Sequence, residues 1–363
     1  MKQHRSSIIA VLILILCLGT LSSYPRAQSA ADTLPRHLTD QEFWLIMEEF
    51  SEPGGYFRSD NLLSNELYIQ NVIPDLLRRT KPGGVYMGVG PEQNFTYIAS
   101  LKPRMAFIID IRRGNTHTHL MYKALFELSA DRADFLGRLF SRKRPDGLDS
   151  KSTAASIFDS YSNVQPSDEE AFREHLNAIT KLLVKKHGFP LSSDDLAGIE
   201  YVYYNFYHFG PNLNYNSSGQ SFGGRWGNSS SYSSLMTRTD DDGVDRGYLA
   251  NEENFKVVKE LQERNLIIPL VGDFAGPKAI RTVGSYLKEH DAMITAFYLS
   301  NVEMYLGIGW NNFCASVASL PLDENSTFIR TSRARGGFRG GFGGGLTTSL
   351  GAMYSETKNC KDW

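Results

Sequence analysis

Glycine, acidic and amide residues follow four predicted strands of this sequence, where ligands of parallel sheets bind. Gly88-Val89-Gly90 ends the first apolar run, Asp110 the second, Gly272-Asp273 the third and Ser300-Asn301 the fourth. Because the carboxyl ends of parallel strands meet at one edge of a sheet, we expect these residues to surround one crevice. Asp110 comes 22 positions after Gly88, a spacing typical of an acid that accepts hydrogen bonds from ribose hydroxyls.

The turn after the first strand disfavours a pyrophosphate. The third glycine of a dinucleotide fingerprint is missing from Gly88-Val89-Gly90-Pro91-Glu92-Gln93. Pro91 removes a backbone donor and Glu92 brings negative charge to the start of the next helix, whereas a pyrophosphate needs free N–H groups and positive potential. S-adenosylmethionine contains an adenosine without phosphate, and its sulfonium and ammonium groups tolerate an acid. The turn therefore opposes a pyrophosphate but does not oppose that kind of nucleoside.

Alternating strands and helices would position these residues. Apolar runs predict strands at 85–90, 105–111, 267–273 and 293–299, with a further strand at 327–331. Helices are expected between consecutive strands, at 91–101, 117–140 and 277–288. A strand, a helix and a second strand form a βαβ unit, whose strands are parallel. The predicted fold class is α/β: a three-layer sandwich with a mostly parallel, Rossmann-like sheet.

The rest of the chain is arranged around that sheet. Residues 31–82 are expected to form N-terminal helices, the first begun by the capping box Thr39-Asp40-Gln41-Glu42 and the second at 65–79. The Rossmann-like domain covers 83–350, and a large helical and loop insertion occupies about 115–260. Within it, 167–186 and 254–264 are predicted helices and 142–164 is expected to be irregular. Residues 351–363 form a C-terminal tail.

These strand ends resemble the motifs of the class I S-adenosylmethionine-dependent methyltransferase fold. Longer phrases resemble an uncharacterised bacterial family with that core: Ser51-Glu52-Pro53-Gly54-Gly55, Gly90-Pro91-Glu92-Gln93-Asn94-Phe95-Thr96-Tyr97-Ile98 and Asp110-Ile111-Arg112-Arg113-Gly114-Asn115. The resemblance covers roughly residues 39–350. It implies a methyltransferase-type sheet with S-adenosylmethionine as the cofactor.

The resemblance also implies a cofactor contact for each motif position. Gly88 and Gly90 would flank the methionine part of S-adenosylmethionine, with Asn94 in the same phrase. Asp110 would hold the ribose. Asp273 and Phe274 would meet the edge and the face of the adenine.

Catalytic residues are harder to choose. The resemblance places Asn301 beside the transferred methyl group, and Glu303 is a candidate base two residues later; Tyr305 and His119 are alternatives. Catalysis in such transferases rests largely on proximity and orientation, and a base is needed only when the nucleophile must lose a proton. No metal is expected, because His117 and His119 do not share a helix face.

The N-terminus indicates export. Lys2, His4 and Arg5 precede an apolar run from Ile8 to Leu18, and small residues follow at 27–31, which is the pattern of a secretory signal in 1–30. Cleavage after Ser29 or Ala31 would place the protein in the periplasm or outside the cell, without a membrane anchor; an uncleaved anchor is the alternative. Cys314 and Cys360 could then pair in an oxidising compartment.

Two functions therefore remain open. The first is a small-molecule methyltransferase. The second is a non-catalytic descendant of the fold that binds an extracytoplasmic ligand, since S-adenosylmethionine is made in the cytoplasm.

The formal charge of −2 over 363 residues gives no bulk positive field for nucleic acid. One Arg-Gly-Gly tract at 335–343 is a weak exception, and the aromatic segment 199–211 predicts either a buried helix or a pocket wall. The sequence does not indicate an oligomeric state.

Overall fold

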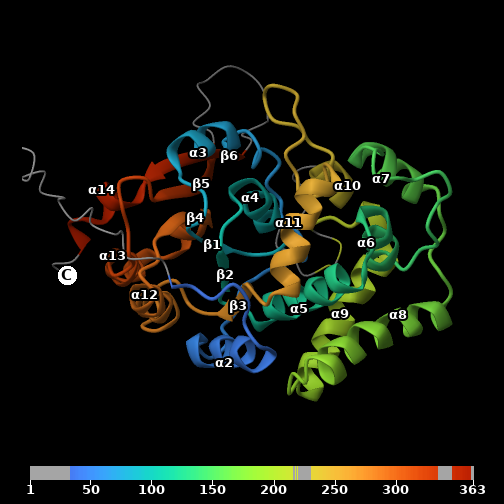
Figure 1. Ribbon diagram of the computed structural model, residues 1–363, viewed down its shortest axis with the longest axis horizontal. Coiled ribbons are helices and arrows are strands. Elements are labelled where there is room, and N and C mark those ends of the chain that lie inside the picture. The colour runs from blue at the N-terminus through green and yellow to red at the C-terminus, as the bar shows by residue number, and fades with distance from the viewer. Residues whose placement is uncertain (1–32, 216, 218, 220–229, 334–345, 361–363) are drawn as a thin grey trace, which may run out of the picture. The chain divides into compact units, whose positions relative to one another are not determined.

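Six strands form one sheet in the order β3-β2-β1-β4-β5-β6 (Figure 1). Their bounds are β1 Val85–Val89, β2 Met105–Asp110, β3 Ile267–Val271, β4 Ile294–Ser300, β5 Thr327–Arg333 and β6 Leu346–Ala352. All neighbouring pairs are parallel except β5 with β6, which is antiparallel. The predicted α/β class with a mostly parallel sheet is therefore confirmed.

The sheet comes from a computed structural model, which describes residues 33–215, 217, 219, 230–333 and 346–360. The chain divides into two units, Met1–Thr33 and Leu34–Trp363, and every element named here belongs to the second. The predicted signal at 1–30 and the Arg-Gly-Gly tract at 335–343 lie outside the described residues.

Strand register brings the predicted motif positions to one edge. All residues of β1, β2 and β3 are buried, as expected for parallel strands covered on both faces. Val89 is paired with Ile109, and Asp110 with Val271, so these three strands end at nearly the same level. The strand order reverses between β1 and β4, and in open parallel sheets a crevice forms at such a switch point.

Helices lie on both sides of the strands (Figure 1). Helix α4 (Gln93–Leu101) contacts α3 (Ile73–Arg79) and α11 (Glu252–Glu263), while α12 (Ala279–Glu289) contacts α2 (Asp40–Phe50) and α13 (Trp310–Ala318). In Figure 1, α11 lies to the right of the strands and α12 and α13 lie to the left. The predicted capping box is present, because Thr39 Oγ1 accepts from Glu42 N and Glu42 accepts from Thr39 N.

The chain between β2 and β3 is helical. Its helices are α5 Arg113–Leu128, α6 Arg132–Leu139, α7 Ala154–Ser162, α8 Glu169–Lys181, α9 Ser193–Phe209, α10 Tyr232–Met236 and α11, with a π-helical turn at Leu182–Lys186 and a 3-10 turn at Gly210–Asn212. Among the described residues, the only β pairing there is the bridge between Asn214 and Ser231. The aromatic segment forms α9, and none of its residues lines the cavity described below.

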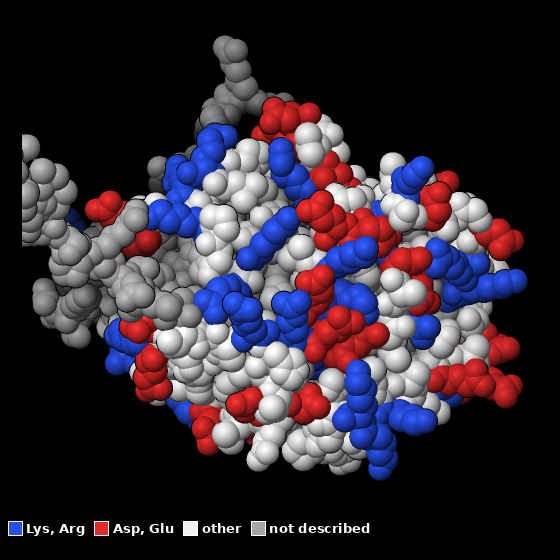
Figure 2. All heavy atoms as spheres, in the orientation of Figure 1, with Lys and Arg blue, Asp and Glu red and all other residues white. Residues whose placement is uncertain are grey.

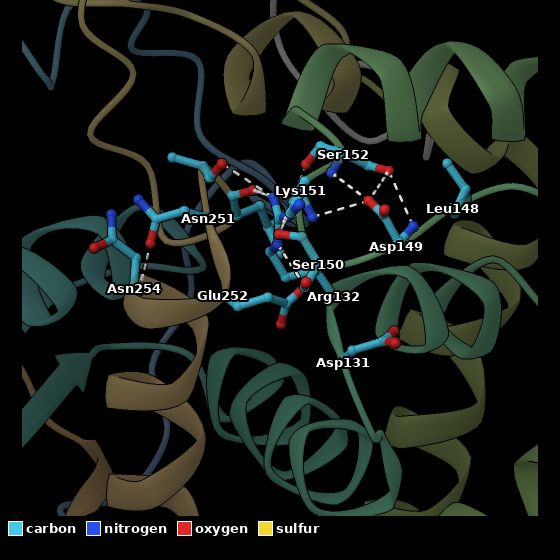
Figure 3. A network of polar contacts seen from close by, with 12 residues as sticks. Asp131, Arg132, Leu148, Asp149, Ser150, Lys151, Ser152, Asn251, Glu252 and Asn254 are labelled. Carbon is cyan, nitrogen blue, oxygen red and sulfur yellow. Dashed lines mark hydrogen bonds and ion pairs between the residues drawn. The ribbon is translucent and has the colours of Figure 1, made fainter.

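Arg132 fixes this helical region from the inside, with only 1% of its surface exposed (Figure 3). Its Nε donates to Glu252 Oε1 at 2.9 Å, and Nη1 donates to the carbonyls of Leu249 and Ala250. Nη2 donates to the carbonyls of Ser150 and Ser152. One guanidinium therefore joins the start of α6, the turn before α7 and the start of α11.

The structure differs from the prediction in two helix boundaries and in two further elements. The expected helix 65–79 is only α3, because Pro74 lies in its first turn and cannot continue a preceding helix. The expected helix 117–140 is two helices, since Asp131 caps α6 afresh. Helix α7 lies in the stretch expected to be irregular, and β6 was not predicted.

The C-terminal part is closed by a disulfide bond. Cys314 of α13 is bonded to Cys360, which follows α14 (Met353–Thr357), across a sequence separation of 46 residues. The loop so formed contains both β5 and β6. The disulfide therefore holds the antiparallel edge of the sheet to α13.

Candidate functional site

One cavity of about 380 Å³ lies at the carboxyl ends of the strands. The loops after β1, β2, β3 and β4 contribute to it, together with the segment 56–66. Its lining residues are Tyr56, Phe57, Asn61, Leu63, Ser64, Asn65, Glu66, Val89, Gly90, Pro91, Gln93, Asp110, Ile111, Arg112, Tyr215, Asp273, Phe274, Ala275, Ser300, Asn301, Val302, Tyr305 and Leu306. This volume is within the range of small-molecule sites.

Five predicted site residues meet at this cavity. Gly90, Asp110, Asp273, Phe274 and Asn301 all line it, although they come from loops far apart in sequence. The convergence of the strand ends, which the spacing predicted, is therefore present in the structure.

Gly88 and Asn94 do not line the cavity; they build the turn beneath it. The side-chain amide of Asn94 donates to the carbonyls of Val89, Gly90 and Pro91, and Oδ1 accepts from Tyr86 Oη at 2.8 Å. A Cβ at Gly88 would overlap Asn94 Oδ1. The glycine at 88 thus makes room for an internal side chain, whereas Gly90, with φ +79°, is needed for the turn itself.

Asp110 is engaged by its own loop. Its Oδ1 accepts from the backbone N–H and the Nε of Arg112 at 2.9 and 3.0 Å, and Oδ2 accepts from Nη2 at 2.8 Å. Arg112 Nη1 donates to the carbonyls of Ser59 and Asp60. A carboxylate has about four acceptor positions, so one position on Oδ2 remains for a ligand.

Asp273 is held by the phrase Ser51–Gly55. Glu52 accepts from the backbone N–H groups of Asp273, Lys278 and Ala279 at 2.8–3.1 Å, which shapes the loop between β3 and α12. Asp273 Oδ1 accepts from Ala275 N at 2.9 Å, and the residue is exposed toward the cavity mouth. Phe274 is buried and stacks on Phe297, with ring centroids 5.9 Å apart.

The catalytic candidates separate. Asn301 lines the cavity, as does Tyr305, but Glu303 does not. Glu303 lies in the 3-10 turn Val302–Tyr305, where its Oε1 accepts from Arg330 Nη2 at 3.0 Å. His119 is buried, and its Nε2 lies 2.9 Å from the carbonyl oxygen of Gly90.

Glu66 is a site residue that sequence reasoning missed. It lines the cavity with 3% of its surface exposed, and its oxygens accept from three hydroxyls: Tyr298 Oη at 2.7 Å, Ser300 Oγ and Thr331 Oγ1. Burial raises the pKa of this carboxyl, and the three hydroxyl donors oppose the rise. Ser300 has φ +51°, which is uncommon for a residue with a Cβ. A strained residue in a binding site is a functional indication.

Gln93 extends this arrangement. Its Nε2 donates to the carbonyl of Val89 at 3.3 Å and to Tyr298 Oη at 3.4 Å. The Tyr298 hydroxyl therefore accepts a hydrogen bond from Gln93 and donates one to Glu66. Gln93 Oε1 is buried and has no hydrogen-bond partner among the described residues. Within the described part of the chain, the cavity lining thus contains two buried oxygens without a donor, Gln93 Oε1 and Asn61 Oδ1.

Two buried groups beneath the turn have shifted pKa values. Glu92 is fully buried, and burial raises its pKa to about 7 although Ser64 N donates to Oε1 at 3.1 Å. Burial lowers the pKa of His119 to about 4, so that its imidazole is neutral near pH 7. The β1–α4 turn is therefore supported by groups that are costly to charge.

Surface and metal features give few further constraints. Acidic and basic side chains are interspersed over the face shown in Figure 2. Within the described ranges, no group of three His, Cys, Asp or Glu side chains could hold a metal ion. No described helix combines the length and apolar character needed to cross a membrane.

The fold and the cavity define an α/β protein with a ligand-sized site at the strand ends. A family model described as "Domain of unknown function (DUF7790)" matches residues 62–195 and 214–347, and the chain belongs to this family. The match includes Glu66, the β1–α4 turn, Asp110, Asp273 and Asn301. A search of curated proteins finds no match.

Proposed function

We propose that the cavity binds S-adenosylmethionine and that the protein is a methyltransferase acting on a small molecule. The observation that carries this proposal is the convergence of Gly90, Asp110, Asp273, Phe274 and Asn301 on one cavity of ligand size. The strand order with its reversal between β1 and β4 supports a Rossmann-like, methyltransferase-type core. Helices on both sides of the strands support the three-layer arrangement.

The charges of the cavity suit this cofactor better than a phosphate ester. Glu66, Asp110 and Asp273 line it. The guanidinium of Arg112 forms an ion pair with Asp110 and donates to two backbone carbonyls. An anionic pyrophosphate would be repelled, and a ligand with sulfonium and ammonium groups would be attracted. S-adenosylmethionine supplies an activated methyl group when bound.

Each lining residue then has a role. Gly90 lets the methionine part approach the backbone, and the remaining acceptor position of Asp110 takes one ribose hydroxyl. Asp273 accepts from the adenine amino group, with Phe274 along the base. Asn301 orients the acceptor, and Tyr305 closes the mouth. Catalysis in this arrangement rests on proximity.

A second function, non-catalytic binding of an extracytoplasmic ligand, is favoured by two observations. The Asp110–Arg112 pair leaves too few acceptor positions for both ribose hydroxyls unless Arg112 moves. The Cys314–Cys360 disulfide is typical of oxidising compartments, which supports export through the N-terminal signal. In this alternative, the same cavity takes a different small molecule.

Calorimetry on the purified protein separates the two functions. Titration with S-adenosylmethionine and S-adenosylhomocysteine should give binding, whereas ATP, which shares the adenosine but carries phosphates, should not bind. Asp273→Asn keeps the acceptor for Ala275 N and removes the charge at the adenine end, so we expect it to weaken binding about tenfold.

Asp291→Asn is the matched control, because Asp291 is exposed before the other end of β4. Absence of heat with both S-adenosyl compounds would remove the methyltransferase proposal and leave the alternative. Fractionation of the cells that make the protein tests export directly.

A further inference from the structure

The end of the cavity near β4 and β5 has an unbalanced carboxylate. The Glu66 carboxyl group accepts hydrogen bonds from the hydroxyls of Tyr298 and Ser300 of β4 and of Thr331 of β5. Among the described residues, no Lys, Arg or His forms an ion pair with it, and Arg112, the one cation of the described lining, is paired with Asp110. Neutral hydroxyls orient Glu66 but do not neutralise it.

Two acceptors belong to side chains that line this end. The hydroxyl donors hold the Glu66 carboxylate in one orientation at the cavity wall, and Gln93 Oε1 is buried without a donor. Exchanging the positions of the amide oxygen and nitrogen of Gln93 would not help, because the oxygen would then face the carbonyl of Val89, which now accepts from Nε2. A buried acceptor without a partner costs about 1–3 kcal/mol, and a ligand N–H group would satisfy it.

Aromatic rings line the cavity as well. Phe57 and Tyr305 are in edge-to-face contact, with centroids 5.4 Å apart, and Tyr56 is 85% exposed at the mouth. Such rings offer apolar surface for the carbon part of a ligand. The guanidinium of Arg58 already lies over the Tyr305 ring, 5.8 Å from its centroid.

We propose that this end of the cavity binds a small organic amine, with its ammonium group donating to Glu66 and Gln93 Oε1 and its apolar part against Phe57 and Tyr305. The pairing supplies both the missing charge and the missing donor. That the amine is the methyl acceptor rests on the proposed function, because Asn301 and the β4 end lie on the acceptor side of that arrangement. Binding of the amine itself does not require S-adenosylmethionine.

A charged and a neutral probe of the same shape test this proposal. We would titrate the protein with 2-phenylethylamine and with 2-phenylethanol, in which a neutral hydroxyl group replaces the ammonium group. The amine should bind at least tenfold more tightly. Glu66→Gln should lose that preference, while Asp291→Asn should keep it. Equal binding of both probes, or absence of amine binding at millimolar concentration, would overturn the proposal.

Two further measurements keep the outcome clear. If Glu66→Gln fails to fold, Tyr305→Leu replaces it, because Tyr305 is half exposed and its loss should weaken amine binding several-fold. S-adenosylhomocysteine is titrated into the same samples. Binding of S-adenosylhomocysteine without the amine rejects only the amine site, and binding of the amine alone rejects only the methyltransferase. Displacement of the amine by S-adenosylhomocysteine would reject a separate amine position.

Discussion

The guanidinium of Arg112 contacts both carboxylate oxygens of Asp110, with Nε 3.0 Å from Oδ1 and Nη2 2.8 Å from Oδ2. The side chains are only 10% and 6% exposed, respectively. Removing one partner of a buried pair leaves the other charge uncompensated. The residue expected to hold a ribose is therefore also part of the structural support of the cavity.

We expect Arg112→Gln to lower the free energy of unfolding by about 3–5 kcal/mol, because Asp110 would stay buried without its cation. The double variant Asp110→Asn, Arg112→Gln should lose less than the sum of the two single variants. Urea denaturation of the four proteins measures this coupling. Additivity within about 0.5 kcal/mol would contradict a direct interaction.

Glu92 should make stability depend on pH. Its pKa is raised to about 7 in the folded protein, so between its unfolded value near 4.5 and pH 7 the folded state holds a proton that the unfolded state has lost. Stability therefore falls as pH rises through this window and is level above it, with a total loss of about 3 kcal/mol.

Glu92→Gln resembles the protonated form and removes this dependence. The difference in unfolding free energy between the variant and the original protein should grow in favour of the variant from pH 5 to pH 8. Urea denaturation at several pH values measures it, with Glu289→Gln, at an exposed position, as the control for loss of one carboxylate. A difference that does not change with pH would count against this role.

Arg132→Lys should destabilise the helical region by about 2–4 kcal/mol. Lysine offers three donors to the five acceptors that Arg132 contacts, and it lacks the planar fork, so buried carbonyls would lose their partners. Thermal unfolding measures the change. Arg264→Lys, in an exposed pair with Glu260, is the control and should change little.

Reduction of Cys314–Cys360 should lower the free energy of unfolding by about 2–4 kcal/mol, since the bond restricts a long loop in the unfolded chain. Thermal unfolding with and without dithiothreitol measures this. A variant with serine at both positions should start lower and show no response to the reductant. An equal response in both proteins would show that the reductant acts elsewhere.

The sheet and the edge that forms the site could be predicted because their signals are local. Buried parallel strands such as Met105–Asp110 are continuous apolar runs, and a polar residue or glycine after each run marks the strand end. The strand β6 could not be predicted in this way, because Leu-Thr-Thr-Ser-Leu-Gly-Ala has few apolar residues and pairs only at one edge.

Site residues were harder to assign because their roles depend on distant partners. A glycine that makes room for Asn94 has the same sequence signature as one that makes room for a ligand, so the sequence alone does not show which neighbour Gly88 accommodates. Glu66 falls at the start of the helix predicted at 65–79, whereas in the structure it precedes α3 in an irregular segment, and its partner Thr331 is 265 positions away. The hydrogen bond between Glu66 and Thr331 exists only once β5 has joined the sheet.

The covalent loop from Cys314 to Cys360 encloses Thr331, one of the three hydroxyl-bearing residues that fix Glu66. Formation of this disulfide therefore restrains the strand that supplies one of the hydrogen-bond donors to Glu66, as well as stabilising the fold. Protein produced in a reducing cytosol should hold the Glu66 side chain less firmly than protein that has passed through an oxidising compartment.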